Sequence, residues 1–334
     1  MALTAFRRLQ AGLESTRGTA VAADKRITGA LSMSQSPGFH TPTDERFSLA
    51  ERFRQNRVAH MSRLRYQGDA TFEQIIDFLA MTLVGGVTPT TPGGTLPRDW
   101  TFTPDLEAAN TQDSYTFEYG DDTQAWESAF VTCVSMDLGI NLGGVVSLGA
   151  ELVGRFAEKT TFTGSLTDPS VEEVVGDGAR FFLDTTWAGI GGTEYDAMLA
   201  GGSIRLNSGL IPVRYADGLD SNGRANFSTL IENKRSHGMD LDLIISSDMI
   251  TNVYDNFAAG TSAAIRIVFD LAANSIETSF NHELEIDMFG KFEGEPEIFG
   301  ERDGENLVRM QFVSYDDGSG NELTVRVRNT LTAL

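Results

Sequence analysis

A row of carboxylates in the last quarter of the chain is its most suggestive chemical feature. In the segment FNHELEIDM, residues 280–288, apolar residues alternate with four polar ones, Asn281, Glu283, Glu285 and Asp287. Because successive side chains of a β-strand point to opposite faces, this alternation predicts a strand with its carboxylates on one face. The row is either the solvated outer face of a sheet or the wall of a water-filled bore, where carboxylates would keep a polyanion from adhering.

Other residues with chemical potential do not form a catalytic or metal-binding pattern. None of the histidines (His40, His60, His237, His282) lies within a few residues of another His or Cys, so zinc spacing is absent. The alternation around Cys133 predicts an inert thiol inside a strand. GIGGTE at 189–194 lacks the strand and helix of a dinucleotide loop, and DDGSGNE at 316–322 is typical of a hairpin turn rather than a calcium loop. There is no Gly-x-Ser-x-Gly elbow. We therefore expect no enzyme activity, cofactor or metal.

The charge of the chain is strongly uneven. The formal net charge is −21, and residues 1–65 hold eleven Lys/Arg against five Asp/Glu, a net +6, so residues 66–334 carry −27. An acidic body disfavours nucleic-acid binding, because affinity for phosphate backbones comes from Lys and Arg. The single cysteine excludes an intramolecular disulfide, and no apolar stretch resembles a signal peptide or a membrane helix. We expect a soluble protein that is made without export.

Two segments of the chain match without a gap. ESAFVTCVSMDLG, 127–139, aligns with ETSFNHELEIDMF, 277–289, so that Glu127 falls on Glu277 and Asp137 on Asp287. Both alternate with period two, which predicts half-buried strands. The match makes Asp137 a further candidate for the acidic row and suggests that the chain contains an internal repeat.

The elements around the two segments support the repeat. Each half has an apolar stripe of helical spacing, at 69–81 with a Thr71–Gln74 capping box, and at 247–259 with Ser247 as N-cap and Gly260 as the stop. The expected strands then follow in the same order in both halves, at 115–119, 145–154 and 160–166, and at 265–269, 306–315 and 322–329. Long turn-rich segments at 29–46 and 202–223 precede the helices, and such loops often contact partners.

These patterns predict a mainly β fold with flanking helices, in a chain divided into four segments. We predict an N-terminal arm at 1–28, a first domain at 29–168, an acidic linker at 169–178 and a second domain at 179–334.

Several segments together resemble the major tail tube proteins of long, non-contractile-tailed bacteriophages. The resemblance is carried by ESTRGTAVA (14–22), DATFEQIIDFLAM (69–81), YTFEYGDD (115–122), WESAFVTCVSMDLGINLGGVVSLGAELVGR (126–155) and GSGNELTVRVRN (318–329). It implies two packed β-sheets with one helix per domain, and neighbouring subunits whose strands close a barrel around a lumen. Many members have one such domain and form rings of six. A chain with two tandem domains would close the same pseudo-sixfold ring with three copies, and a homohexamer is the alternative.

The implied function is structural. Stacked rings would form the virion tail tube, assembled in the host cytoplasm, that conducts viral DNA without binding it specifically. The expected partners are other copies, a tape measure protein, and terminator and baseplate proteins, with no membrane. Glu283, Glu285, Asp287 and Asp137 are the candidate lumen-facing residues. Arg17 is the candidate anchor of a basic arm on the next subunit, and Glu14 is its candidate partner, either between subunits or within the chain. The alternative function is a β-rich receptor- or carbohydrate-binding fibre or hub module of a virion.

Overall fold

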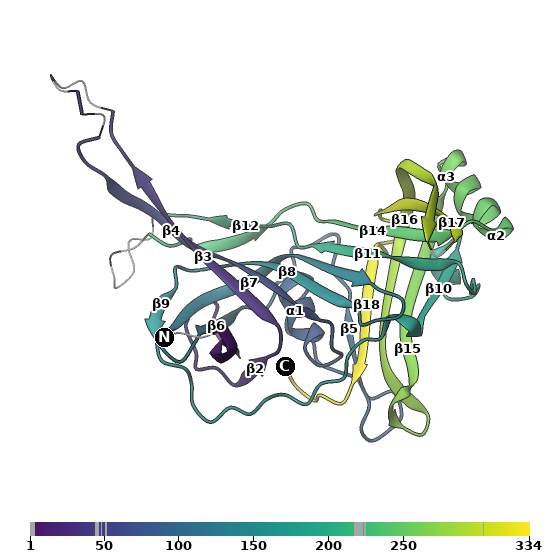
Figure 1. Ribbon diagram of the computed structural model, residues 1–334, viewed down its shortest axis with the longest axis horizontal. Coiled ribbons are helices and arrows are strands. Elements are labelled where there is room, and N and C mark those ends of the chain that lie inside the picture. The colour runs from purple at the N-terminus through teal and green to yellow at the C-terminus, as the bar shows by residue number, and fades with distance from the viewer. Residues whose placement is uncertain are drawn as a thin grey trace.

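The computed structural model describes residues 4–43, 47, 49–50, 52–216, 223, 225–302 and 304–334 (Figure 1). A 16-stranded sheet accounts for most of the chain, and β12 (Leu210–Val213) and β13 (Thr229–Glu232) form a separate two-stranded sheet. The expectation of a mainly β fold with flanking helices is confirmed. No helix in the described residues is long and apolar enough to cross a membrane.

The strands of the large sheet fall into two groups along the chain. The first group is β1 (Arg8–Leu13), β3 (Ala30–His40), β4 (Asn56–Asp69), β6 (Tyr115–Gly120), β7 (Ala125–Ile140), β8 (Ser147–Gly154) and β9 (Glu158–Thr160). The second group is β10 (Ala179–Asp184), β11 (Leu199–Asn207), β14 (Ser236–Ile244), β15 (Ser262–Glu277), β16 (Phe280–Arg302), β17 (Glu305–Ser314) and β18 (Leu323–Asn329).

The same antiparallel pairings occur in both groups. In the first, β1 pairs with β6, β6 with β7, β7 with β8 and β9, β8 with β4, and β4 with β3. In the second, β10 pairs with β15, β15 with β16, β16 with β17 and β18, β17 with β14, and β14 with β11. Each strand of the first group therefore has a counterpart in the second, in the same chain order.

One further pairing joins the groups, since β11 of the second group pairs with the C-terminal half of β7. β18 of the second group also pairs with β5 (Arg98–Phe102), a strand from the first half of the chain that belongs to neither group. A continuous path of strands results, β3-β4-β8-β7-β11-β14-β17-β16. β2 (Lys25–Ile27) extends the first group beyond β1.

The register of the two groups differs from the ungapped sequence match. The Arg155 N–H donates to the Ala129 carbonyl just after β8, and the Tyr315 N–H donates to the Phe289 carbonyl just after β17. Ala129 is thus the counterpart of Phe289, whereas the sequence match placed it on Ser279. Glu277 ends β15, so the matched segment crosses the β15–β16 turn. The match selected the corresponding strands but the wrong register, because a shift by an even number of residues preserves the alternation.

A helical segment follows β4 and another follows β14. α1 (Ile75–Thr82) starts later than predicted, although the Thr71 hydroxyl does accept the Gln74 N–H at 3.2 Å. The second consists of α2 (Ser247–Met249), a π turn (Ile250–Tyr254) and α3 (Asp255–Ala259). Its N-cap is Ser246 rather than Ser247, and Gly260, with φ of 65°, ends it as predicted.

The remaining strand predictions have mixed outcomes. The strands expected at 115–119, 145–154, 265–269, 306–315 and 322–329 are present as β6, β8, β15, β17 and β18. The strand expected at 160–166 is wrong, since β9 ends at Thr160. The turn-rich segment at 29–46 is largely strand β3, which forms with β4 a hairpin that projects from the body at the left of Figure 1.

Candidate assembly surface

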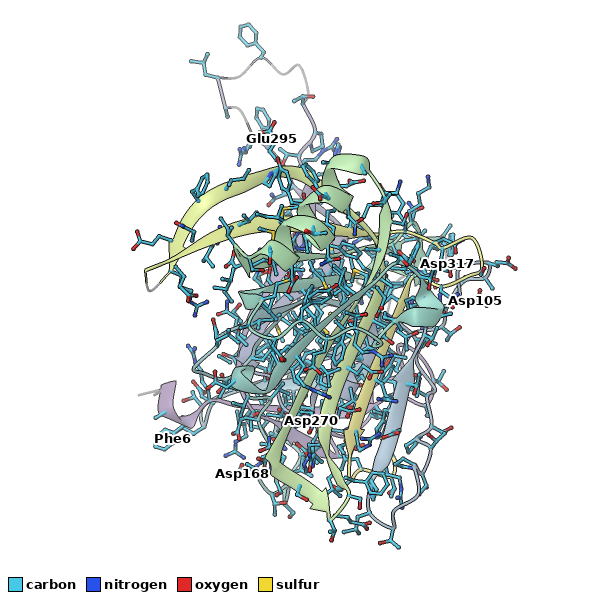
Figure 2. The ribbon with its side chains drawn as sticks, turned by 90° about the vertical axis from the view of Figure 1, so that its right-hand side faces the viewer. Phe6, Asp105, Asp168, Asp270, Glu295 and Asp317 are labelled. Atoms are coloured by element: carbon cyan, nitrogen blue, oxygen red, sulfur yellow. The ribbon has the colours of Figure 1, made fainter. Side chains whose placement is uncertain are left out.

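The carboxylates of β16 lie in a network of ion pairs. Arg266 on β15 contacts both oxygens of Asp287, with Nε–Oδ1 and Nη2–Oδ2 distances of 2.6 and 2.7 Å. Arg326 on β18 reaches Glu283 Oε1 at 2.7 Å and Glu285 Oε2 at 3.0 Å. In Figure 2 these strands run side by side on the face turned towards the viewer, which also carries Asp270.

This arrangement changes the interpretation of the acidic row. The side chains of Glu285 and Asp287 are 9% and 7% exposed, and Glu283 is little more exposed at 13%. The cross-strand register creates the network, because Arg266 lies opposite Asp287 and Arg326 opposite Glu285. The prediction of a free row of lumen-facing carboxylates is therefore corrected for these three residues: within the chain they are mostly buried and paired.

Burial also affects how Glu285 titrates. Burial raises the pKa of the Glu285 carboxyl and Asp287 raises it further, whereas Arg326 and Arg266 act in the opposite direction. An acid with a raised folded-state pKa lowers stability as the pH rises from its unfolded pKa through its folded pKa.

We expect Glu285→Gln to increase the free energy of unfolding at pH 7. The amide cannot ionise, and Arg326 and Arg266 keep Glu283 and Asp287 as partners. Urea unfolding between pH 3.5 and 7.5 measures the difference between the variant and the wild type. The difference should shrink as the pH falls below the usual range of a glutamate, and a variant that is less stable at pH 7 would contradict the expectation.

Asp137 lies on a different surface. Alternate residues of the continuous strand path, such as Met136, Leu138, Ile204 and Leu241, are buried in the core. The residues between them point to the opposite side, and we call this side the Asp137 face. Its ion-paired residues are Arg65, Glu151, Asp137, Arg205, Asp240, Asp242, Arg309 and Glu297.

The Asp137 face carries a cross-strand ladder of ion pairs. Arg205 Nε is 3.1 Å from Asp137 Oδ1, and Arg205 Nη2 is 3.7 Å from Asp240 Oδ2. Arg309 likewise contacts Asp242 at 2.7 Å and Glu297 at 3.8 Å. Most of these side chains are well exposed, so each pair contributes only about 0–1 kcal/mol to stability. Since each of these arginines faces two carboxylates, the ladder keeps an excess of negative charge.

The N-terminal segment is part of the body and not a free arm. Residues 8–13 form β1, which pairs with β6 along its whole length. The Glu14 side chain is buried and accepts hydrogen bonds from the Ser114 and Thr116 hydroxyls and from the Phe130 N–H, at 2.7, 2.9 and 2.7 Å. Arg17 donates to the Gln112 carbonyl. The predicted intersubunit roles of Glu14 and Arg17 are therefore corrected, because both side chains bind groups of their own chain.

The remaining predicted features have structural roles. Cys133 is buried, and burial raises its thiol pKa to about 12. Asp316 and Asp317 accept backbone N–H groups of the 316–322 turn, so a turn is present as predicted. The predicted hairpin is wrong, because the described strands on either side, β17 and β18, each pair with β16 and not with each other. The 3-10 helix at Trp187–Gly189 ends at the first residue of GIGGTE, and the rest of this segment is a loop. Within the described ranges no group of three or more His, Cys, Asp and Glu side chains could hold a metal ion.

Both ring nitrogens of His282 have partners. Its Nδ1 is 3.0 Å from the Asn274 carbonyl oxygen and its Nε2 is 3.4 Å from Glu73 Oε1. Burial lowers the pKa of His282, but the bonds to Glu73 and Asn274 outweigh it and raise the pKa above its usual value. His282 borders a pocket of about 660 Å³ in which Lys25 and Asp77 form an ion pair at 2.9 Å, so the charged groups there stabilise each other.

Sequence reasoning missed the exposed apolar residues of the β3–β4 hairpin. Phe47 and Leu49 near its tip are fully exposed, and Phe39 and Val58 are about half exposed. The segment from 39 to 58 also holds Arg46, Arg52, Arg54 and Arg57. Exposed aromatic and arginine side chains are typical of protein interfaces, so the composition FRQNRV alone could have indicated a contact surface.

A scan against models of protein families finds no match to this chain, and a search of the curated proteins finds none either. Strand pairing, surface chemistry and the resemblance stated above therefore carry the functional proposal.

Proposed function

We propose that this chain is a structural virion protein whose rings stack into a tail tube that conducts DNA. The observation that supports this most is the repeated strand pairing, which ends in an unpaired strand edge on each side. Among the described strands, β3 pairs only with β4, and beyond Lys291 β16 has β17 on one side and none on the other. A sheet with two open edges can be continued by further copies.

The repeated pairing also favours rings of three. Two tandem tail-tube domains in each chain place two equivalent units in every subunit, so three copies would close a pseudo-sixfold ring. A head-to-tail contact of this kind joins two different surfaces of the same chain. It forms a closed ring when the rotation from one copy to the next is a full turn divided by a whole number. A ring of six chains is the alternative outcome.

We propose that the Asp137 face lines the bore. It is the solvent-exposed side of the strands that continue across the whole chain, and in a closed ring one side of those strands must face inward. Its acidic excess would lower the attraction between the wall and a passing polyanion. Asp137 thus stays a candidate lumen residue, whereas Glu283, Glu285 and Asp287 become part of a structural ion-pair network.

Electron microscopy of the concentrated, purified protein tests this function. We expect hollow tubes whose averaged end views show threefold modulation of a pseudo-sixfold ring. True sixfold rings would support the tube and contradict the count of three. Compact closed particles under all conditions would contradict the tube and favour the alternative, a receptor- or carbohydrate-binding module.

A further inference from the structure

The contact between the two strand groups provides a template for the contact between copies. Within the chain, β11 continues the first group by pairing with the C-terminal half of β7. The counterpart of β11 is β3, and the counterpart of β7 is β16. Both counterparts have an open edge, and they lie at opposite ends of the long axis of the molecule (Figure 1), too far apart to pair within one chain.

We propose that β3 of one copy pairs antiparallel with residues 292–302 of β16 in a second copy, and that the β3–β4 hairpin packs beside this seam. This inference rests on the proposed function and specifies its subunit interface. The seam would repeat between copies the β7–β11 contact that is present inside each chain.

The register of the seam follows from the matched strands. Arg155 after β8 and Tyr315 after β17 are counterparts, so residues equally far before them are counterparts too, such as Gly149 and Arg309. Gly149 pairs with Asp137, and Arg309 pairs with Glu297. Asp137 and Glu297 are therefore counterparts. Leu152 on β8 and Phe312 on β17 are likewise counterparts, and the pairing can be followed from them across two more strands. On one side Leu152 pairs with Leu64 and Leu64 with Met33, and on the other Phe312 pairs with Met239 and Met239 with Ile204.

Met33 is therefore the counterpart of Ile204, and the next residue along each strand makes Ser34 the counterpart of Arg205. Inside the chain Arg205 lies opposite Asp137. The seam should therefore place Ser34 of one copy opposite Glu297 of the next. Arg63, which is the β4 partner of Ser34, would then lie one strand away from Glu297.

Charge and exposure are complementary across this seam. The β16 segment carries Glu293, Glu295 and Glu297, and Glu295 is labelled in the upper part of Figure 2. The hairpin that would meet it is rich in arginine. Opposite charges on the two surfaces favour this head-to-tail pairing over an edge pairing with a copy of itself.

Apolar contacts have a template as well. Inside the chain, the segment between β11 and β14 packs on the first group through Leu210, Phe227 and Leu230, which contact Phe130 and Val153. The corresponding segment of the first group is the hairpin tip, where Phe47 and Leu49 are exposed. The counterparts of Phe130 and Val153 are Gly290 and Val313, and the exposed apolar residue next to them is Tyr315, whose N–H donates to the Phe289 carbonyl. The hairpin tip of the second copy can cover Tyr315.

Pro296 is compatible with the seam. It lies where the register of β16 against β17 shifts between Glu293 and Glu297, so it occupies an irregular part of the strand. Proline is tolerated at such bulges because the position does not need a ladder N–H.

Cysteine cross-linking tests the seam. Residues opposite each other in antiparallel strands have Cα atoms about 4.5–5.5 Å apart, which suits a disulfide. Ser34 and Glu297 are both exposed, so Ser34→Cys and Glu297→Cys should fold. We expect the double variant, oxidised with copper phenanthroline, to give covalent dimers and trimers on a denaturing gel. A mixture of the two single variants should stop at dimers.

Ser34→Cys combined with Ser319→Cys, a residue of the exposed β17–β18 turn, is the matched control and should cross-link at least tenfold less. Tubes without the Ser34–Glu297 cross-link would overturn the seam and leave the proposed function intact. Cross-linked trimers that form no tubes would support the seam and contradict the tube. Absence of any self-association would contradict both, and ladders extending to hexamers would support the seam but contradict rings of three.

Discussion

Glu14→Ala is expected to lower the free energy of unfolding by about 3–4 kcal/mol. The carboxylate accepts the Phe130 N–H and the hydroxyls of Ser114 and Thr116, and it also accepts the Gly18 N–H at 2.7 Å. Its removal leaves buried donors without an acceptor, each at a cost of about 1–3 kcal/mol. The total stays below their sum because a water molecule can enter the space and bind some of these donors.

One of these donors, the Phe130 N–H, belongs to an irregular part of β7. The φ of this residue is 55°, a conformation that is rare for an aromatic residue, and it lies where the partners of β7 change from β6 and β9 to β11 and β8. Glu14 binds its N–H and so stabilises the irregular backbone at this transition. Urea denaturation measures the loss. Glu107→Ala, in an exposed loop, is the control and should change stability by less than about 0.5 kcal/mol. A loss below about 1 kcal/mol for Glu14→Ala would show that the donors find other acceptors.

Arg266→Met should cost about 3–5 kcal/mol, which is the usual loss when one partner of a buried ion pair is removed. Asp287 would lose both of its bonds to the guanidinium, and Glu285, whose Oε2 is 3.3 Å from Arg266 Nη1, would lose one of its two arginines. The variant should unfold at a lower urea concentration than the wild type, with an unchanged dependence on urea.

Arg309→Met is a matched control for this prediction. Arg309 also contacts both oxygens of an aspartate, Asp242, but its side chain is 60% exposed, so the loss should be below about 1 kcal/mol. The double variant Arg266→Met, Asp287→Leu should be more stable than Arg266→Met alone, because it no longer buries an unpaired carboxylate. Equal losses for Arg266→Met and Arg309→Met would refute the distinction between the two charged faces.

Periodicity predicted most strands but could not predict their partners. Alternation in FNHELEIDM correctly placed Glu283, Glu285 and Asp287 on one face of a strand. Whether that face is wet depends on the neighbouring strands, and the arginines that cover it come from residues 266 and 326. Such pairing across long sequence separations has no signature in a local pattern.

The N-terminal segment shows a second limit of sequence reasoning. Small residues and Arg17 suggested a basic arm that contacts the next subunit, but β1 pairs with β6, and the Glu14 carboxylate binds Ser114 beside β6 and Phe130 on β7. Tertiary hydrogen bonds of this kind outweigh local propensity. The segment at 29–46 was expected to be a long turn-rich hairpin region, since its serine-rich and glycine-bearing sequence is also typical of a loop, but most of it is strand β3.

The pairing of β5 with β18 has a consequence for the timing of synthesis. In the part of the sheet that the structure describes, β5 pairs only with β18, and Trp100 Nε1 donates to Asn329 Oδ1 at 3.0 Å across a separation of 229 residues. At translation rates of about 5–20 residues per second, a nascent chain therefore carries β5 without its partner for roughly 10 to 45 seconds. During that time the buried indole of the finished protein lacks its acceptor. The sheet can be completed only after the ribosome has synthesised β18, even if the first strand group folds faster than this.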